Sequence, residues 1–399
     1  MNPNLDQLQP YPFEKLQALK SGLTPPAALS PIYLSIGAPK HAAPEWLKQT
    51  LIEHLDDIAH YPATRGIPAL REAICTWLIQ RYGLPADSLD PEQHVLPVSG
   101  TREALFAIAQ TLIQPTPAPP MVLMPNPFYQ IYEGAALLAH AQPYFLNTTA
   151  ETHFIPDFAA VPESIWAHCQ LLYLCTPGNP AGAVMPEETL AHVLNLAEQY
   201  DFIIACDECY SEIYPDEHCP PMGLLQAANN LGNTDYKRCL VFNSLSKRSN
   251  VPGLRSGFVA GDAELIRRFH QYRTYQGCTL PVPTQKASIA AWQDETHVRD
   301  NRTQYREKFA KVLAILSPVL DVYEPDAGFY LWPKVPIDDT TFTQGLYQTQ
   351  NVTVLPGQYL SREAQGINPG QQHVRMALVA TTEECVEAAH RIKHYITSL

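Results

Sequence analysis

Unbroken runs of apolar residues recur through the middle of the chain, at residues 121–124, 171–174, 202–205, 240–242 and 257–260. Strands that are buried on both faces have such continuous runs, whereas half-exposed strands alternate between apolar and polar residues. We therefore predict that these five segments are strands in the interior of one sheet.

A helical pattern lies between two of these strands. Leu190, Val193, Leu194 and Ala197 repeat at helical spacing after a Pro-Glu-Glu start, which is typical of an amphipathic helix. Strands that alternate with helices form βαβ units. The fold class predicted is therefore α/β, with a mostly parallel sheet flanked by helices.

The pattern changes in the last third of the chain, where a long charged and apolar helix is predicted over 299–316. Shorter strands are predicted at 329–332, 352–355 and 374–378, before a last helix from about 382. This order is typical of a smaller α+β domain. We predict an amino-terminal arm over 1–43 that joins the small domain, a large domain over 44–283 and the small domain over 284–399.

The composition excludes several classes of protein. The chain has 399 residues, 46% of them hydrophobic and 17% charged, with a formal net charge of −13. Disorder is excluded by the hydrophobic content, and the negative charge argues against nucleic-acid and membrane partners. No run approaches 18 apolar residues and the first residues do not resemble a signal peptide, so we expect a cytoplasmic protein.

Nine cysteines, an odd number, are spread through the chain, and a chain of this length does not need disulfides to fold. Cys206 and Cys209 have C-x-x-C spacing, but no second pair or histidine lies near them in the sequence. We predict free thiols and no metal site.

Three segments with candidate chemistry follow predicted strands or begin helices. Ser99-Gly100-Thr101-Arg102 precedes a helical pattern, so its backbone forms either an anion site or an ordinary helix cap. Asp207 directly follows a buried strand, where it needs a cationic partner or caps the next helix. Lys247 lies beside Ser244 and Ser246, and Arg255 follows eight residues later.

A lysine beside hydroxyls and an arginine, at the edge of a sheet that presents Asp207, suits a phosphorylated aldehyde cofactor. The motifs occur in the order Ser99-Gly100-Thr101, Pro177-Gly178-Asn179-Pro180-Ala181-Gly182, Asp207-x-x-Tyr210, Ser244-x-Ser246-Lys247, Arg255 and Arg375. This set resembles the pyridoxal-phosphate aminotransferases of fold type I, the class I/II family, over nearly the whole chain. The resemblance implies a mostly parallel sheet of seven strands.

The resemblance also implies roles around the cofactor, pyridoxal 5′-phosphate. Lys247 would bind the aldehyde and move the substrate proton, and Asp207 would pair with the pyridine nitrogen. Asn179 and Tyr210 would hydrogen-bond the ring hydroxyl, and Tyr129 would stack on the ring. The phosphate would be held by Gly100, Thr101, Ser244, Ser246 and Arg255, and Arg102 is counted with these cofactor-binding residues.

For the substrate, the family pattern implies that Arg375 binds the α-carboxylate, with Gly37 and Asn179 beside it. Tyr61 matches a tyrosine that reaches the phosphate of the neighbouring subunit, which implies a homodimer with shared active sites. Ala181 and Ala327 depart from the usual family residues where the substrate side chain would run.

Longer matches at 2–13, 125–134, 207–214 and 244–261 resemble bacterial N-succinyldiaminopimelate aminotransferases. The reaction implied is the transfer of an amino group from N-succinyl-L,L-diaminopimelate to 2-oxoglutarate, which gives N-succinyl-2-amino-6-oxopimelate and glutamate in lysine and diaminopimelate biosynthesis. Such substrates need a cation for a distal carboxylate. The candidate donors are Lys40, Arg65, Arg102 and Asn250.

Three alternatives stay open at this point. The chain could be another class I aminotransferase, acting on aspartate, aromatic amino acids or acetylornithine. It could be a pyridoxal-phosphate-dependent carbon–sulfur β-lyase, which shares the aspartate, tyrosine and lysine. A transcription regulator with this fold is disfavoured by the charge of −13.

Overall fold

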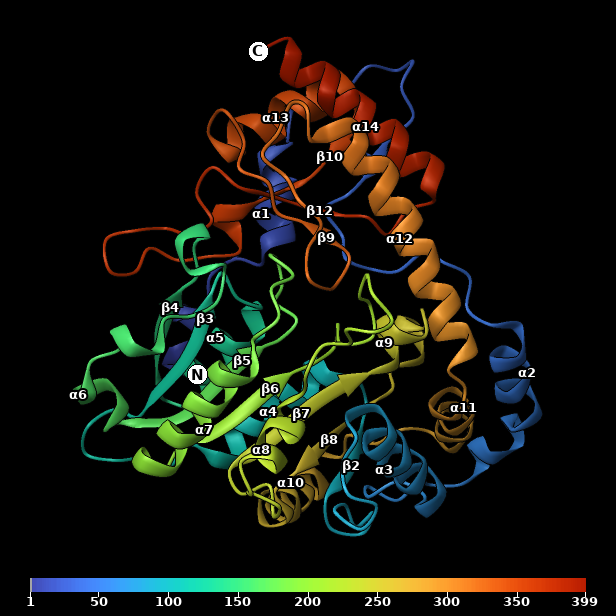
Figure 1. The fold of residues 1–399 in the computed structure, drawn as a ribbon, viewed down its shortest axis with the longest axis vertical. Coiled ribbons are helices and arrows are strands. Elements are labelled where there is room, and N and C mark those ends of the chain that lie inside the picture. Colours follow the sequence, from blue (N-terminus) through green and yellow to red (C-terminus); the bar gives the residue numbers. More distant parts are fainter. Residues whose placement is uncertain (1) are drawn as a thin grey trace.

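The computed structural model describes residues 2–399, and its larger domain is built on one sheet of seven strands (Figure 1). Their order across the sheet is β2-β8-β7-β6-β5-β3-β4. The bounds are β2 Val95–Val98, β3 Met121–Asn126, β4 Gln142–Asn147, β5 Cys169–Cys175, β6 Ile203–Asp207, β7 Cys239–Ser244 and β8 Gly257–Gly261. All run parallel except β8, which pairs antiparallel with both β2 and β7, so the predicted α/β fold class is confirmed.

Helices cover both faces of this sheet, as Figure 1 shows. One face packs on α4 (Thr101–Leu112), α5 (Gln130–Leu138) and α10 (Ala263–Gln276). The other packs on α3 (Pro68–Tyr82), α7 (Glu187–Tyr200), α8 (Leu224–Asn230) and α11 (Val282–Gln293). Burial on both faces explains why the central strands have continuous apolar runs.

The smaller domain has its own apolar core, which includes Ile32 and Leu34 from the amino-terminal segment. Its strands are β9 (Tyr330–Leu331), β10 (Val352–Thr353), β11 (Leu355–Pro356) and β12 (Val374–Ala377), and β1 (Ile32–Tyr33) pairs with β10. Its helices are α13 (Asp339–Gln350), α14 (Thr382–Thr397) and most of α12 (Thr296–Leu316), while α1 (Pro12–Leu19) contributes Leu16 to a small cluster with Trp332 and Leu355.

Two strands of the large sheet, β2 and β4, were absent from the sequence prediction. Both lie at the edges of the sheet. β4 carries mostly half-buried residues, and β2 contains Pro97, so neither has the unbroken apolar run of a central strand.

The helix α11 bears on where one domain ends and the other begins. A boundary at 283/284 assigns α11 to the small domain, but Ala287, Ala291 and Trp292 pack into the core beneath the large sheet. Farther along, Tyr305 and Phe309 of α12 pack into the small-domain core. We therefore propose that the boundary lies within α12, the long helix that joins the two domains in Figure 1.

Candidate active site

The predicted site residues meet at the carboxyl ends of the parallel strands, which is where ligands bind in open α/β sheets. Asp207 is the last residue of β6, Ser244 is the last residue of β7, and Thr101 begins α4. They line a cavity of about 460 Å³ together with residues of the arm and the small domain, among them Gly37, Tyr330 and Arg375.

Lys247 lies in α9 (Leu245–Arg248), a single helical turn that begins directly after β7. Ser244 caps this turn, because its Oγ accepts a hydrogen bond from the Ser246 amide at 3.0 Å. The Lys247 Nζ donates to the Gly37 carbonyl at 2.5 Å and lies 5.3 Å from the centre of the Phe329 ring. Burial disfavours the charged amine and lowers its pKa to about 8, so Lys247 loses its proton far more readily than an exposed lysine.

Asp207 is only 5% exposed, and burial raises the pKa of its carboxyl. Its Oδ2 accepts from the Tyr132 hydroxyl at 2.8 Å, and its Oδ1 accepts from the Cys209 amide at 3.2 Å. These two donors favour the ionised form but are both neutral, so the carboxylate still suits a cationic partner on the cavity side. The sequence analysis missed Tyr132, whose helical spacing from Tyr129 was the only available signal.

A set of hydroxyls and one guanidinium lies beside the amino terminus of α4. Ser244 Oγ donates to Ser246 Oγ at 2.8 Å, and Arg255 Nη2 donates to the Ser99 carbonyl at 3.4 Å. The Gly100 amide donates to the Val98 carbonyl at 2.8 Å. The amides that can bind an anion are therefore those of the first turn of α4, which begins at Thr101.

Gly100 is required by this packing. Its φ of +85° is in the left-handed region, and a Cβ at this position would lie 2.1 Å from the Arg255 Nη2. Only glycine allows the arginine to approach the turn.

Arg375 is the cation on the small-domain side of the cavity and is 5% exposed. Its Nη1 donates to Asn179 Oδ1 at 3.0 Å and its Nη2 donates to the Ser35 carbonyl at 2.9 Å. Its guanidinium also lies 4.5 Å from the centre of the Tyr330 ring. All these partners are neutral, and Nε is buried without a partner among residues 2–399, so this arginine suits a carboxylate from outside the chain.

Two tyrosines lie between the lysine side and the arginine side of the cavity. The Tyr210 and Tyr330 hydroxyls are 3.0 Å apart, and burial raises the pKa of Tyr210 well above its usual value. A Cβ on Gly37 would lie 2.0 Å from the Tyr330 hydroxyl oxygen, so glycine is needed there as well. The sequence analysis named Tyr210 and Gly37 but not Tyr330, because a tyrosine in a short strand carries no signal of its own.

Arg102 lies at the outer part of the cavity, between two tyrosines. Its Nε donates to the Tyr129 hydroxyl at 2.6 Å and its Nη2 donates to the Tyr11 hydroxyl at 3.0 Å. Tyr11 comes from the amino-terminal arm, so the arm and the large domain together orient this guanidinium. Both partners are neutral, which leaves its positive charge available to a ligand.

Several predicted residues lie away from this cavity. Tyr61 is 103% exposed and does not line it. Of the other candidates for a distal carboxylate, Lys40, Arg65 and Asn250 do not line it either: Arg65 bonds the Glu92 carbonyl, and Asn250 donates to Asn301 at 2.9 Å. Among the four candidates only Arg102 faces the cavity.

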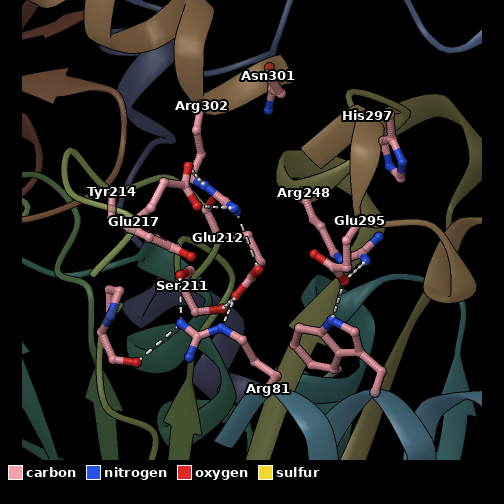
Figure 2. A network of polar contacts seen from close by, with 12 residues as sticks. Arg81, Ser211, Glu212, Tyr214, Glu217, Arg248, Glu295, His297, Asn301 and Arg302 are labelled. Atoms are coloured by element: carbon pink, nitrogen blue, oxygen red, sulfur yellow. Dashed lines mark hydrogen bonds and ion pairs between the residues drawn. The ribbon is translucent and has the colours of Figure 1, made fainter. Parts of the chain in front are cut away.

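Arg248, the residue after Lys247, anchors α9 to neighbouring segments of the chain. Its side chain is buried, donates to the Ala291 carbonyl at 2.6 Å and to the Asp294 carbonyl at 3.2 Å, and pairs with Glu295 (Figure 2). It also lies 4.9 Å from the Trp292 ring centre. The backbone of the lysine turn is therefore anchored to the end of α11 and the start of α12.

A second charged group in Figure 2 joins the two domains. Arg302 of α12 pairs with Glu217 at 2.7 Å, and its Nη1 lies 3.7 Å from Glu212. Glu212 in turn pairs with Arg81 of α3 at 2.6 Å. Since Glu212 and Glu217 follow β6, this network links the segment after Asp207 to the small domain and to α3.

Within residues 2–399 there is no group of three or more side chains that could hold a metal ion, and all nine cysteines are free. None of the helices in this part of the chain is both long enough and apolar enough to cross a membrane. The cavity brings together an amine of lowered pKa, a buried carboxyl, the amino terminus of a helix and three guanidinium groups, those of Arg102, Arg255 and Arg375.

Comparisons with known proteins agree with this arrangement. Residues 30–392 match the sequence model of the family "Aminotransferase class I and II". An aminotransferase structure from Neisseria meningitidis Z2491 is 48% identical, with a TM-score of 0.94 over 98% of this chain and 99% of that one.

Two further relatives have more specific names. An LL-diaminopimelate aminotransferase from Desulforudis audaxviator is 28% identical over 97% of this chain and 95% of its own length. The structure of a probable N-succinyldiaminopimelate aminotransferase from Thermus thermophilus is 27% identical, with a TM-score of 0.83 over 96% of this chain and 100% of that one. The chain belongs to the class I and II aminotransferases, whose members depend on pyridoxal phosphate.

Proposed function

We propose that this aminotransferase transfers an amino group between N-succinyl-L,L-diaminopimelate and 2-oxoglutarate, in lysine and diaminopimelate biosynthesis. The observation that carries the proposal is that three guanidiniums without an acidic partner line one cavity. Arg255 lies beside the turn at the start of α4, where a phosphate would bind, and Arg375 and Arg102 remain for substrate carboxylates. Both substrates carry a second carboxylate far from the reacting carbon, and arginine binds carboxylates through paired hydrogen bonds. Arg375 would hold the α-carboxylate and Arg102 the distal one.

The residues of the cavity suit pyridoxal 5′-phosphate. The absence of a Cβ on Gly100 lets the Arg255 guanidinium approach the turn at the start of α4. Thr101, Ser244, Ser246 and Arg255 all line the cavity there, which suits a phosphate group. The buried Asp207 carboxyl suits the protonated ring nitrogen. When bound, the cofactor supplies an aldehyde that reacts with amines and a ring that withdraws electrons from the carbon bearing the amino group.

Each residue near the reacting atoms then has one task in our proposal. The Lys247 amine, with a pKa of about 8, can accept and return a proton at Nζ near neutral pH. Tyr210 and Asn179 would donate to the ring hydroxyl, and Tyr129 would lie on the ring face.

We include a homodimer with shared active sites in the proposal. Tyr61 lies fully exposed near other exposed apolar residues of α2 (Glu45–Glu53) and the following turn, namely Trp46, Ile52, Leu55 and Ile58. Such a surface is typical of a subunit interface, and Tyr61 would reach the partner's phosphate from it. Sedimentation analysis that gives only a monomer at micromolar concentration would contradict this part of the proposal.

We also propose that the protein resides in the cytoplasm. All nine cysteines are free thiols, which is typical of proteins in a reducing compartment.

A second candidate substrate is L,L-diaminopimelate without the succinyl group, which is favoured by the name of the Desulforudis audaxviator relative. Both compounds keep the distal carboxylate of diaminopimelate. They differ at the distal amino group, which is an ammonium in L,L-diaminopimelate and a neutral amide bearing an additional carboxylate in the succinylated compound. A cation such as Arg102 attracts the carboxylate and repels the ammonium.

The test is a comparison of kcat/KM for N-succinyl-L,L-diaminopimelate, L,L-diaminopimelate, acetylornithine and aspartate, each with 2-oxoglutarate. We expect the succinylated compound to be the best donor. A higher kcat/KM for L,L-diaminopimelate would favour the second candidate, and conversion of cystathionine to pyruvate without any amino transfer would point to a carbon–sulfur lyase.

A further inference from the structure

Lys308 in the middle of α12 is completely buried. Its ammonium nitrogen contacts only neutral hydrogen-bond partners: it donates to His41 Nε2 at 2.8 Å and to the Leu378 carbonyl at 2.9 Å. Burial of a charge without an acidic partner is costly, and here it lowers the pKa of Lys308 to about 8. A leucine or methionine would fill the same space without this cost, so the contacts of the amine need an explanation.

These contacts belong to a chain of hydrogen bonds in which each residue donates to the next, from Lys308 through His41 and Asn301 to the Lys247 carbonyl. An ammonium can only donate, so His41 accepts at Nε2 and carries its proton on Nδ1. The Nδ1 group then donates to Asn301 Oδ1 at 2.8 Å, and Asn301 Nδ2 donates to the Lys247 carbonyl at 3.4 Å. Burial also lowers the pKa of His41, in agreement with a neutral ring. We call Lys308, His41 and Asn301 the His41 cluster.

The His41 cluster joins the segments that surround the substrate carboxylate. His41 lies four residues after Gly37, whose carbonyl accepts from the Lys247 amine. Leu378 directly follows β12, the strand that carries Arg375. The Lys40 amide donates to the Val379 carbonyl at 3.2 Å, so the arm segment is also bonded to the chain just beyond β12. The His41 cluster thus connects two segments to α12: the arm segment that contains Gly37, and the chain that follows β12.

We propose that Lys308, acting through His41 and Asn301, is a positioning residue for binding of the substrate α-carboxylate. It keeps the segment at 35–41 and the end of β12 at a fixed separation, so that Gly37 and Arg375 face the same carboxylate. The inference rests on the proposed role of Arg375 and Gly37 in binding the α-carboxylate, but it does not depend on which amino donor is the natural one.

The experiment compares Lys308→Met with the wild type as the holoenzyme, using the amino acid that the wild type converts best and 2-oxoglutarate. We expect KM for both to rise about tenfold while kcat changes by less than about threefold, because a carboxylate site that is out of position weakens binding more than it changes the proton transfer. The inhibition constant of succinate, a carboxylate that cannot react, is expected to rise by a similar factor.

Two variants of His41 test the direction of the chain. In His41→Gln the amide reaches the Nε2 position, so its oxygen can accept from Lys308, but no donor remains at the Nδ1 position. In His41→Asn the shorter amide reaches only the Nδ1 position, where it can donate to Asn301, and Lys308 loses its acceptor. Each is expected to raise KM, by less than Lys308→Met. These variants also serve if Lys308→Met does not fold, because His41 is only half-buried.

Lys311→Met is the matched control, since Lys311 lies one turn farther along α12 on the surface, paired with Glu307 at 2.5 Å. It should leave KM and the succinate inhibition constant unchanged. The proposal is overturned if the Lys308 and His41 variants lower the melting temperature with unchanged KM, or if they reduce kcat with no rise in KM.

Discussion

The contact of Arg102 with two tyrosines allows a quantitative prediction about substrate choice. In Arg102→Met the side chain keeps the apolar stem but loses the guanidinium, with its charge and its hydrogen bonds to Tyr129 and Tyr11. We expect a selective loss of activity toward substrates that have a distal carboxylate. The proposed binding of the α-carboxylate by Arg375 should be unaffected, because the two arginines have no hydrogen-bond partner in common.

The size of the effect follows from the exposure of the site. Hydrogen bonds to a charged group contribute about 1.5–3 kcal/mol, and the lower half of this range applies because the Arg102 side chain is exposed. At about 1.4 kcal/mol for each factor of ten, kcat/KM for 2-oxoglutarate should fall about 10- to 40-fold. Tyr11→Phe, which removes only the bond to Nη2, should cost about threefold.

The assay compares 2-oxoglutarate with 2-oxopentanoate, which has the same number of carbon atoms but no distal carboxylate. The ratio of the two kcat/KM values should fall in Arg102→Met, and Arg102→Lys should restore it only in part, since lysine lacks the planar pair of donors. Equal losses for both oxo acids would refute the assignment and indicate that Arg102 acts on the cofactor or on the fold.

Three further outcomes follow from the structure. The rate at which the apoenzyme forms a covalent bond with pyridoxal phosphate should rise with pH up to about 8, because the Lys247 amine must be unprotonated to react and its pKa is about 8. Lys247→Ala should form no covalent bond with the aldehyde. Gly100→Ala should weaken cofactor binding at least about tenfold in an absorbance titration, since its Cβ would lie 2.1 Å from Arg255. The Arg302 guanidinium lowers the pKa of Glu217 from 4.5 to about 2. The wild type should therefore melt at a higher temperature than Glu217→Gln. This difference should have its full size above pH 4.5 and disappear as the pH falls through about 2; a difference that is unchanged at pH 2 would contradict the ion pair.

The succession of apolar runs and helical patterns was enough to predict the α/β fold class. Residues buried on both faces must be apolar at every position, so the central strands β5 and β6 are visible in the sequence itself. The edge strand β4 was missed because most of its residues are only half-buried. The edge strand β2 is buried, but Pro97 interrupts its apolar run. The placement of α11 likewise depends on which core its apolar face meets, and this face looks the same in either domain.

Local motifs also determined much of the candidate site. Asp207 ends β6, Lys247 lies in the single helical turn that follows β7, and Thr101 begins α4. At such positions the local sequence shows that a polar side chain will lie at the edge of the sheet. Arg375 was named from its resemblance to a family motif, because an arginine in a strand is not by itself informative.

Only the tertiary structure decided which partners these residues have. Tyr132 under Asp207 and Tyr330 beside Gly37 come from segments far away in the sequence, and the pairing of Arg102 with Tyr11 requires the arm to cross the cavity. The same holds for Lys308. In the sequence it is one of several charged residues of a long helix, and only the tertiary structure shows that it is buried. Side-chain periodicity records which face of an element is buried, but not what it is buried against, because that is set by long-range packing of the whole chain.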